Sequence, residues 1–105
     1  MTEKTRRQQL QEMLAKEPND AFLRYALAME HAGEANDEEA LRCLQKMFAD
    51  KLDYVPAYLQ AGQVLMRLDR LDEARATFKE GIALAQRLGD AHSAGEMEAF
   101  LDTLG

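Results

Sequence analysis

The side chains that most often carry out chemistry in proteins are scarce in this sequence. It holds two histidines, His31 and His92, one serine, Ser93, and one cysteine, Cys43. A serine nucleophile needs a histidine base that is itself oriented by an acidic group. Ser93 follows His92 directly, but adjacent helical residues point in different directions and no acidic residue is placed to orient the ring. The sequence therefore predicts no catalytic triad, and we expect that this protein is not an enzyme.

Metal and cofactor binding are not expected either. A zinc site needs three or four convergent ligands, and the two histidines lie in different parts of the chain with neither a cysteine nor a regular carboxylate spacing to complete one. The run Asp37-Glu38-Glu39 is interpreted as the acidic first turn of a helix. Cys43 is predicted to be a small core residue, because it falls in an apolar helical pattern. The glycines form no phosphate-binding loop, so no cofactor is predicted.

Composition narrows the classes of partner. The 105 residues are enough for one domain, and 47% of them are hydrophobic and 30% charged. A net charge of −6 argues against nucleic acid, which needs clustered Lys and Arg on one face. No secretory signal follows the basic residues near the N-terminus, and no apolar run is long enough to span a bilayer. We therefore expect a cytoplasmic protein with no membrane partner.

The elements that must position these side chains are helices. Apolar residues recur three and four apart in six segments, whose ranges are 3–16, 20–33, 37–50, 56–68, 71–88 and 91–104. Asn36 is predicted to cap the third helix with Glu39 completing a capping box, and Pro56 suits the first turn of the fourth. Gly89 can end the fifth helix in a left-handed conformation and Asp90 can cap the sixth. The short connections predict antiparallel hairpins.

One apolar pattern recurs at a fixed spacing of 34 residues. A period of that length in helix-forming sequence indicates stacked helical repeats. The three copies are Leu10-Met13-Leu14-Ala15, Leu44-Met47-Phe48-Ala49 and Phe78-Gly81-Ile82-Ala83.

Residues 55–84 resemble a tetratricopeptide repeat, an antiparallel helix pair with a signature of large and small residues. The matching positions are Tyr58, Ala61, Gly62, Leu65, Ala74, Phe78 and Gly81. The resemblance implies an all-α fold of about six helices, in which antiparallel helix hairpins stack as a short right-handed α-solenoid. Leucine at Gly62 or Ala74 is expected to overpack the pair and cost about 1–3 kcal/mol.

Residues 20–52 resemble a second, less regular copy. Ala40 lies 34 residues before Ala74, but the first helix aligns best at an offset of 36, which pairs Ala26 with Gly62 and Phe22 with Tyr58. That alignment also pairs Leu23 with Leu59 and Met29 with Leu65. It places two extra residues in the turn at 33–36. The methionines Met13, Met29 and Met47 are predicted to be core, whereas Met66 falls one residue past the inward pattern.

The resemblance implies one domain over residues 1–105. Its parts would be a half repeat at 1–18, full repeats at 19–53 and 54–88, and a capping helix at 89–105. An apolar stripe on the last helix suits a lid over the final repeat, or else a contact with a second copy. We expect a monomer, with homo-oligomerisation through Met97, Leu101 and Leu104 as the alternative. The stripe consists of Ala91, Ala94, Met97, Leu101 and Leu104.

The family resemblance implies a non-enzymatic adaptor or scaffold that binds a peptide or helix of a protein partner in a concave groove. Arg24 and Arg67 would hold a carboxylate or carbonyl group, and Gln60 and Gln63 would bond an extended chain. As structural alternatives, Leu23 and Leu27 would contact the first segment, and Arg24 and Arg67 would be solvated. The alternative function is a homo-oligomeric assembly module that associates through the last helix. The groove residues would be Leu23, Arg24, Leu27, His31, Leu59, Gln60, Gln63, Met66 and Arg67.

Overall fold

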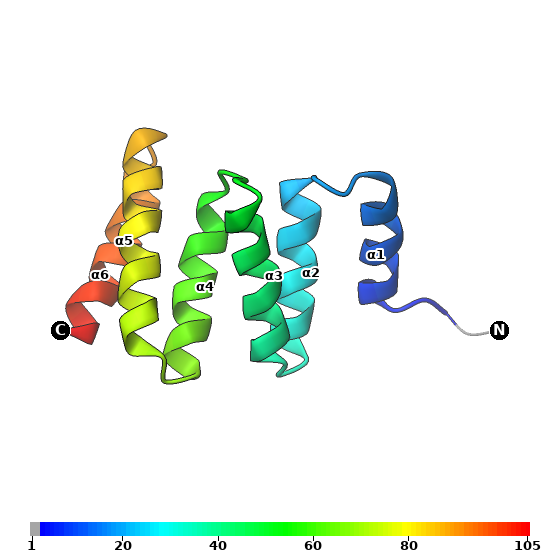
Figure 1. Cartoon of the computed structure of the whole chain (residues 1–105), viewed down its shortest axis with the longest axis horizontal. Coiled ribbons are helices and arrows are strands. Elements are labelled where there is room, and N and C mark those ends of the chain that lie inside the picture. Colours follow the sequence, from blue (N-terminus) through cyan, green and yellow to red (C-terminus); the bar gives the residue numbers. More distant parts are fainter. Residues whose placement is uncertain (1–2) are drawn as a thin grey trace. The chain divides into compact units, whose positions relative to one another are not determined.

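The computed structural model describes residues 3–105, which form six helices and no strand (Figure 1). All six predicted helices are confirmed, with ends that agree to within three residues. None of the described helices is both long and apolar enough to cross a membrane. The helices are α1 (Arg6–Lys16), α2 (Ala21–Gly33), α3 (Asp37–Ala49), α4 (Val55–Arg67), α5 (Leu71–Arg87) and α6 (Ala91–Leu104).

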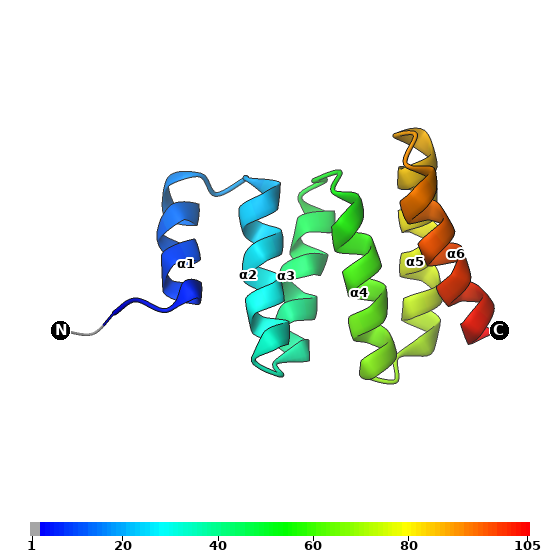
Figure 2. The same cartoon turned by 180° about the vertical axis from the view of Figure 1, so that it is seen from behind.

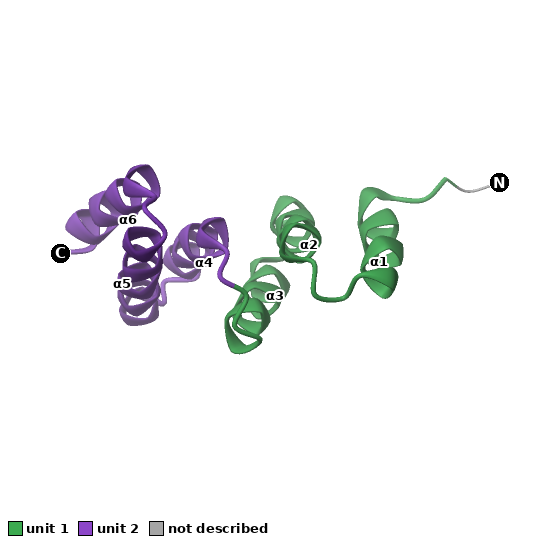
Figure 3. Cartoon of the chain, turned by 90° about the horizontal axis from the view of Figure 1, so that it is seen from above, with its two compact units in different colours: residues 1–52 green, residues 53–105 purple. Residues whose placement is uncertain are grey.

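The described chain divides into two compact units (Figure 3). The first holds α1 to α3 and ends at Leu52, and the second holds α4 to α6 and begins at Asp53. Helices α2 and α3 pack together in the first unit, as do α4 and α5 in the second. Residues 1 and 2 of the predicted half repeat lie outside the described residues.

Helix α1 begins three residues later than predicted, at a capping box. The Thr5 hydroxyl accepts a hydrogen bond from the Gln8 N–H at 3.1 Å, and the Gln8 side-chain oxygen accepts one from the Thr5 N–H at 2.9 Å. This reciprocal pair satisfies two backbone donors that a helix start leaves open. The three-residue spacing of Thr5 and Gln8 is the sequence signature of a capping box.

The capping box predicted for α3 is half right. Asn36 accepts a hydrogen bond from the Glu39 N–H at 3.3 Å, which confirms the cap. The return bond is absent, because the Asn36 N–H donates to the His31 carbonyl at 2.9 Å while the Glu39 carboxylate binds Arg42. The cap at Asp90 and the place of Pro56 in the first turn of α4 are confirmed.

The helix ends show why the hairpins are tight. Gly89 has a φ of 75°, as predicted, and Ala35, Lys51 and Asp69 adopt the same left-handed conformation with φ near 60°. In the connection between α2 and α3, the Asn36 N–H donates to His31 O at 2.9 Å and the Ala35 N–H donates to Ala32 O at 3.0 Å. This pair of bonds closes the last turn of a helix and usually employs glycine.

Replacing Ala35 by glycine is therefore expected to raise the free energy of unfolding by about 1 kcal/mol, since glycine has no Cβ to strain the left-handed conformation. Urea denaturation followed by helical circular dichroism measures the change. Ala32→Gly is the matched control, because Ala32 lies inside α2 and glycine there should destabilise by about 0.5–1 kcal/mol. Equal effects of the two substitutions would contradict the assignment of Ala35.

The 34-residue period holds for the first helices as well, so the predicted offset of 36 is wrong. Helices α2 and α4 begin at Ala21 and Val55, and the left-handed residues Ala35 and Asp69 keep the same interval of 34. The offset of 36 had matched residue types, but Phe22, which it paired with Tyr58, is 58% exposed.

The corrected register puts unusual residues at core positions of α2. Ala28, which is fully buried, takes the place of Gly62. His31 takes the place of the buried Leu65 and is itself only 8% exposed. Arg24 takes the place of Tyr58, so a cation stands where the second repeat has an aromatic ring.

The core of the first unit contains five fully or almost fully buried apolar side chains from α1 and α3, which are Leu10, Ala40, Leu41, Leu44 and Met47. The core prediction is confirmed for Met47, whereas Met29 is half-buried. It is wrong for Met13, which is 48% exposed. Among the described helices of its unit, α1 packs on α2 alone, so only the face that carries Leu10 is covered.

In the second unit, Phe78 is the largest fully buried side chain. Its ring is stacked on that of Phe100 in α6, with centroids 5.3 Å apart and planes 2° from parallel. A Cβ placed on Gly62 would lie 2.2 Å from Phe78 Cε1, so glycine is needed for α4 and α5 to approach. This agrees with the role predicted for the small residues.

Helix α6 packs on α5 and α4, as the view in Figure 2 shows for α5. Met97 is fully buried beside Gly81, and Arg75 donates to the carbonyl oxygen of Leu104 at 2.9 Å. Ala94 is also buried, whereas Ala91 is exposed. Two residues of the predicted stripe, Ala94 and Met97, are thus buried within their own unit, whereas Leu101 and Leu104, predicted for contact with a second copy, are half-buried.

Candidate functional site

The four groove residues predicted on α2 point mainly toward the interior. Leu23 and His31 are buried, and Leu27 is half-buried. The Arg24 side chain is 13% exposed, and its Nη1 lies 2.9 Å from Asp50 Oδ2 at the end of α3. This placement follows from the register, because these residues occupy the inward positions of the repeat. Leu23 and His31 therefore have little surface left for a partner.

Arg24 and Leu27 line a hollow of about 360 Å³ in the first unit. Helices α1, α2 and α3 all contribute to its walls, which combine apolar side chains with three cations. The full lining is Leu14, Pro18, Arg24, Leu27, Arg42, Cys43 and Lys46.

The cations of this hollow are paired with acids of α3 and its C-terminal cap. Lys46 Nζ donates to Asp50 Oδ1 at 2.7 Å, and this bond, followed by the contact with Arg24, lowers the pKa of the Asp50 carboxyl. Arg42 Nε donates to Glu39 Oε2 at 3.0 Å, and the hydrogen bonds from Arg42 lower the pKa of Glu39. The hollow therefore presents less positive charge than its residue types suggest.

A second hollow, of about 340 Å³, opens on another face of the first unit. With a period of 34, the counterparts of Leu59, Gln60 and Gln63 on α2 are aromatic, small and apolar residues. All three counterparts line this hollow, together with Phe22, Arg6 and Glu30. The α2 residues concerned are Tyr25, Ala26 and Met29.

The second hollow is flanked by an exposed aromatic side chain and by an ion pair. Phe22 is 58% exposed, which makes it one of the most exposed large apolar side chains of the described chain. Arg6 Nε lies 3.5 Å from Glu30 Oε1, so a loose ion pair bridges α1 and α2 beside the hollow. The predicted groove did not include this face, because the offset of 36 shifts α2 by two residues; a strict 34-residue alignment places it opposite Leu59, Gln60 and Gln63.

The groove residues predicted on α4 lie on its partly exposed side. Leu59, Gln60, Gln63 and Met66 are half-buried, and Arg67 in the last turn is exposed. The opposite side of α4 is buried by residues such as Ala61 and Leu65. This face belongs to the second unit.

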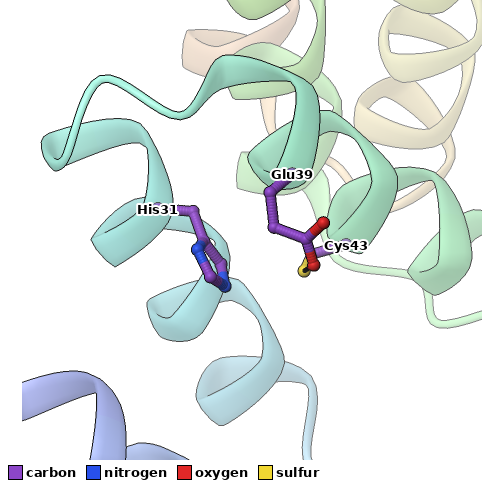
Figure 4. A group of neighbouring side chains, drawn as sticks. All are labelled: His31, Glu39 and Cys43. Atoms are coloured by element: carbon purple, nitrogen blue, oxygen red, sulfur yellow. Dashed lines mark hydrogen bonds between the residues drawn. The ribbon is translucent and has the colours of Figure 1, made fainter.

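The α2–α3 hairpin brings together three groups that can ligate a metal (Figure 4). One nitrogen of His31, a carboxylate oxygen of Glu39 and the sulfur of Cys43 lie within 4.8 Å of one another. The expectation that neither a cysteine nor a carboxylate accompanies a histidine is therefore wrong. The three residues are scattered in sequence, and only the packing of α2 on α3 makes them neighbours.

Cys43 is not the core residue that was predicted. It is half-buried and lines the first hollow, and its sulfur lies 3.9 Å from Glu39 Oε1. Burial is the main cause that raises the pKa of the thiol, and the neighbouring Glu39 carboxylate adds to it. His92 lies apart from this cluster, exposed on α6, with Nε2 3.0 Å from Glu96 Oε1.

Known proteins were compared with this chain in sequence and in structure. No family model matches the chain. The TPR repeat-containing protein PA0015 of Pseudomonas aeruginosa is 30% identical over 95 residues, which cover 90% of each protein.

Solved structures agree with this relative. A tetratricopeptide repeat domain protein from Salinibacter ruber is 34% identical, and its crystal structure superposes with a TM-score of 0.76 over 81% of this chain and 94% of that one. Protein BPP2914 from Bordetella parapertussis is 26% identical with a TM-score of 0.82, over 97% of this chain and 89% of that one. Because this relative is 30% identical over 90% of each protein, and the solved structures superpose on most of the chain, the chain belongs to the tetratricopeptide repeat family.

Proposed function

We propose that this protein is an adaptor that binds a segment of a partner protein, with the face of α2 around Phe22 as its principal contact. Domains of the family generally mediate protein–protein interaction and are generally non-catalytic. The observation that carries the proposal is the exposure of Phe22, at 58%, beside a hollow walled by Tyr25 and Met29. Aromatic residues and methionine are enriched at binding interfaces.

The chemistry of this face defines the occupant. An apolar anchor of leucine or phenylalanine size, carried on a short helix or an extended peptide, would cover Phe22 and Met29 and remove their surfaces from water. Arg6 and Glu30 at the rim can each exchange their mutual ion pair for a polar group of the partner. The expected partner segment is therefore apolar at its centre and polar at its edges.

The α4 face of the second unit offers a different chemistry. The side-chain amides of Gln60 and Gln63 can each donate to and accept from the backbone of an extended chain. Arg67, at the exposed end of α4, can bind a carboxylate. We infer that this face binds a protein segment through polar contacts, and Gln63→Ala and Arg67→Ala are expected to weaken that binding.

The decisive experiment compares two exposed apolar residues. A partner recovered by affinity purification is bound to the purified chain and its dissociation constant is measured by calorimetry. Phe22→Ala is expected to weaken binding by at least about tenfold, as truncation of an aromatic hot spot does. Leu88→Ala is the matched control, because Leu88 is 55% exposed but follows α5 in the other unit.

The control variant should bind as the unchanged chain does. An equal dissociation constant for Phe22→Ala and the unchanged chain would refute the proposed face. Because Phe22 is largely exposed, its truncation should leave the helical circular dichroism intact, which separates lost binding from lost folding.

A further inference from the structure

We propose that His31, Glu39 and Cys43 form a binding site for a divalent cation of the zinc class. The donors are an imidazole nitrogen, a carboxylate oxygen and a thiolate sulfur, and this combination suits zinc and cobalt better than magnesium or calcium. The site belongs wholly to the α2–α3 hairpin and is separate from the apolar face of α2 around Phe22. It would add metal binding to a protein whose proposed role is protein recognition.

The backbone already brings the donors into range. Glu39 and Cys43 are four residues apart, so they lie on one face of α3, and His31 approaches from the last turns of α2 (Figure 4). The three ligand atoms lie within 4.8 Å of one another, with Cys43 Sγ 3.9 Å from Glu39 Oε1. Zinc with tetrahedral bonds of about 2.0–2.3 Å holds its donors roughly 3.3–3.6 Å apart. Small side-chain rotations are therefore enough to close the site.

The burial of His31 is an independent observation that points to a ligand. Its Nδ1 is buried and finds no hydrogen-bond partner among residues 3–105, although His31 occupies a position where the second repeat has the apolar Leu65. An unpaired polar atom at a core position is costly and uncommon. A half-turn of the ring about its Cβ–Cγ bond would bring Nδ1 to the edge that faces Glu39 and Cys43, where a metal ion would give it a bonding partner (Figure 4).

The access to Cys43 also fits an exchangeable site. Cys43 lines the first hollow, through which an ion can reach the sulfur, and three protein ligands leave a fourth position for water. Cys43 would bind as a thiolate, with its proton passing to water. Arg42 competes for the Glu39 carboxylate, but its side chain is largely exposed and can turn into solvent when a cation arrives.

Cobalt is the probe that tests this site, because a thiolate bound to Co²⁺ gives a near-ultraviolet charge-transfer absorption. Titration of the full chain under reducing conditions should saturate that absorption at one equivalent, and zinc should then displace the cobalt. Cys43→Ala should abolish the absorption, and Glu39→Gln should weaken cobalt binding at least about tenfold, as loss of a ligand does. Arg42→Gln should instead tighten binding, since it frees the carboxylate.

The other histidine supplies the control. His92 and Glu96 form an exposed pair four residues apart on α6, so they can hold a cation weakly without any sulfur. His92→Ala should leave the charge-transfer absorption and its midpoint unchanged. The proposal is overturned if the unchanged chain shows no such absorption at millimolar cobalt, or if Cys43→Ala retains it. Glu39→Gln conserves size at a half-exposed position, so it keeps the test valid even if Cys43→Ala fails to fold.

Discussion

Replacing Gly62 by alanine is expected to lower the free energy of unfolding by about 1–3 kcal/mol, although alanine is the better helix former. The added Cβ would lie 2.2 Å from Cε1 and 2.3 Å from Cζ of Phe78. That ring is fully buried and stacked on Phe100, so it has to move out of its packed position to relieve the overlap. Leucine at Gly62 should cost at least as much, because it adds bulk at the same contact.

The same substitution at two other helical glycines gives the control. Apart from the glycine, its chain neighbours and the nearby backbone of its own helix, no described atom lies within 4 Å of a Cβ built on Gly33 or Gly95, and neither has a positive φ. Alanine at Gly95, inside α6, should therefore raise the free energy of unfolding by about 0.5–1 kcal/mol. Urea denaturation of the three variants decides the matter. Stabilisation by all three would show that α4 and α5 do not pack in the described register.

The second large effect is expected to be a gain in stability on replacement of His31. His31→Leu should raise the free energy of unfolding by about 1–3 kcal/mol in the absence of metal, because it removes a buried nitrogen that finds no hydrogen-bond partner among the described residues. Leucine is the residue at the equivalent position of the second repeat, where Leu65 is fully buried. The same variant should lose the cobalt absorption. Thermal unfolding with and without zinc measures the stability, and a cobalt titration measures the loss of the absorption.

His92→Leu is the matched control, because His92 is exposed and its replacement should change stability by less than about 0.5 kcal/mol. Saturating zinc should stabilise the unchanged chain and leave His31→Leu unaffected, which narrows the difference between them. Destabilisation by His31→Leu would mean that the imidazole contributes packing or bonding that leucine cannot replace.

The elements of this fold are encoded locally, and the sequence predicted them well. Helix spacing located all six helices, and turn chemistry identified the left-handed Gly89 and the cap at Asp90. The small residues at Gly62 and Gly81 indicated where helices approach closely, and a Cβ on either would overlap neighbouring side chains. Such signals depend on a few residues close together in the chain, so they can be recognised without knowledge of the tertiary structure.

Local sequence signals did not predict which face of α2 packs against α3. The sequence alignment followed residue type and paired Phe22 with Tyr58, whereas the structure keeps a period of 34 and gives that core position to Arg24. Arg24 is accommodated because Asp50, which caps the end of α3, lies 2.9 Å away. No pattern within α2 reveals that partner, since the contact depends on how α2 and α3 are rotated against each other.

The sequence by itself determined the helix pairs and the repeat family that they resemble. The tertiary structure alone decided which face of α2 is buried, and with it the exposure of Phe22 and the convergence of His31, Glu39 and Cys43. The physical reason is geometric. Helix formation follows from spacing along the chain, but a cluster drawn from two helices depends on their relative rotation, and a shift of two residues turns a helix by about 200° and exchanges its buried and exposed sides.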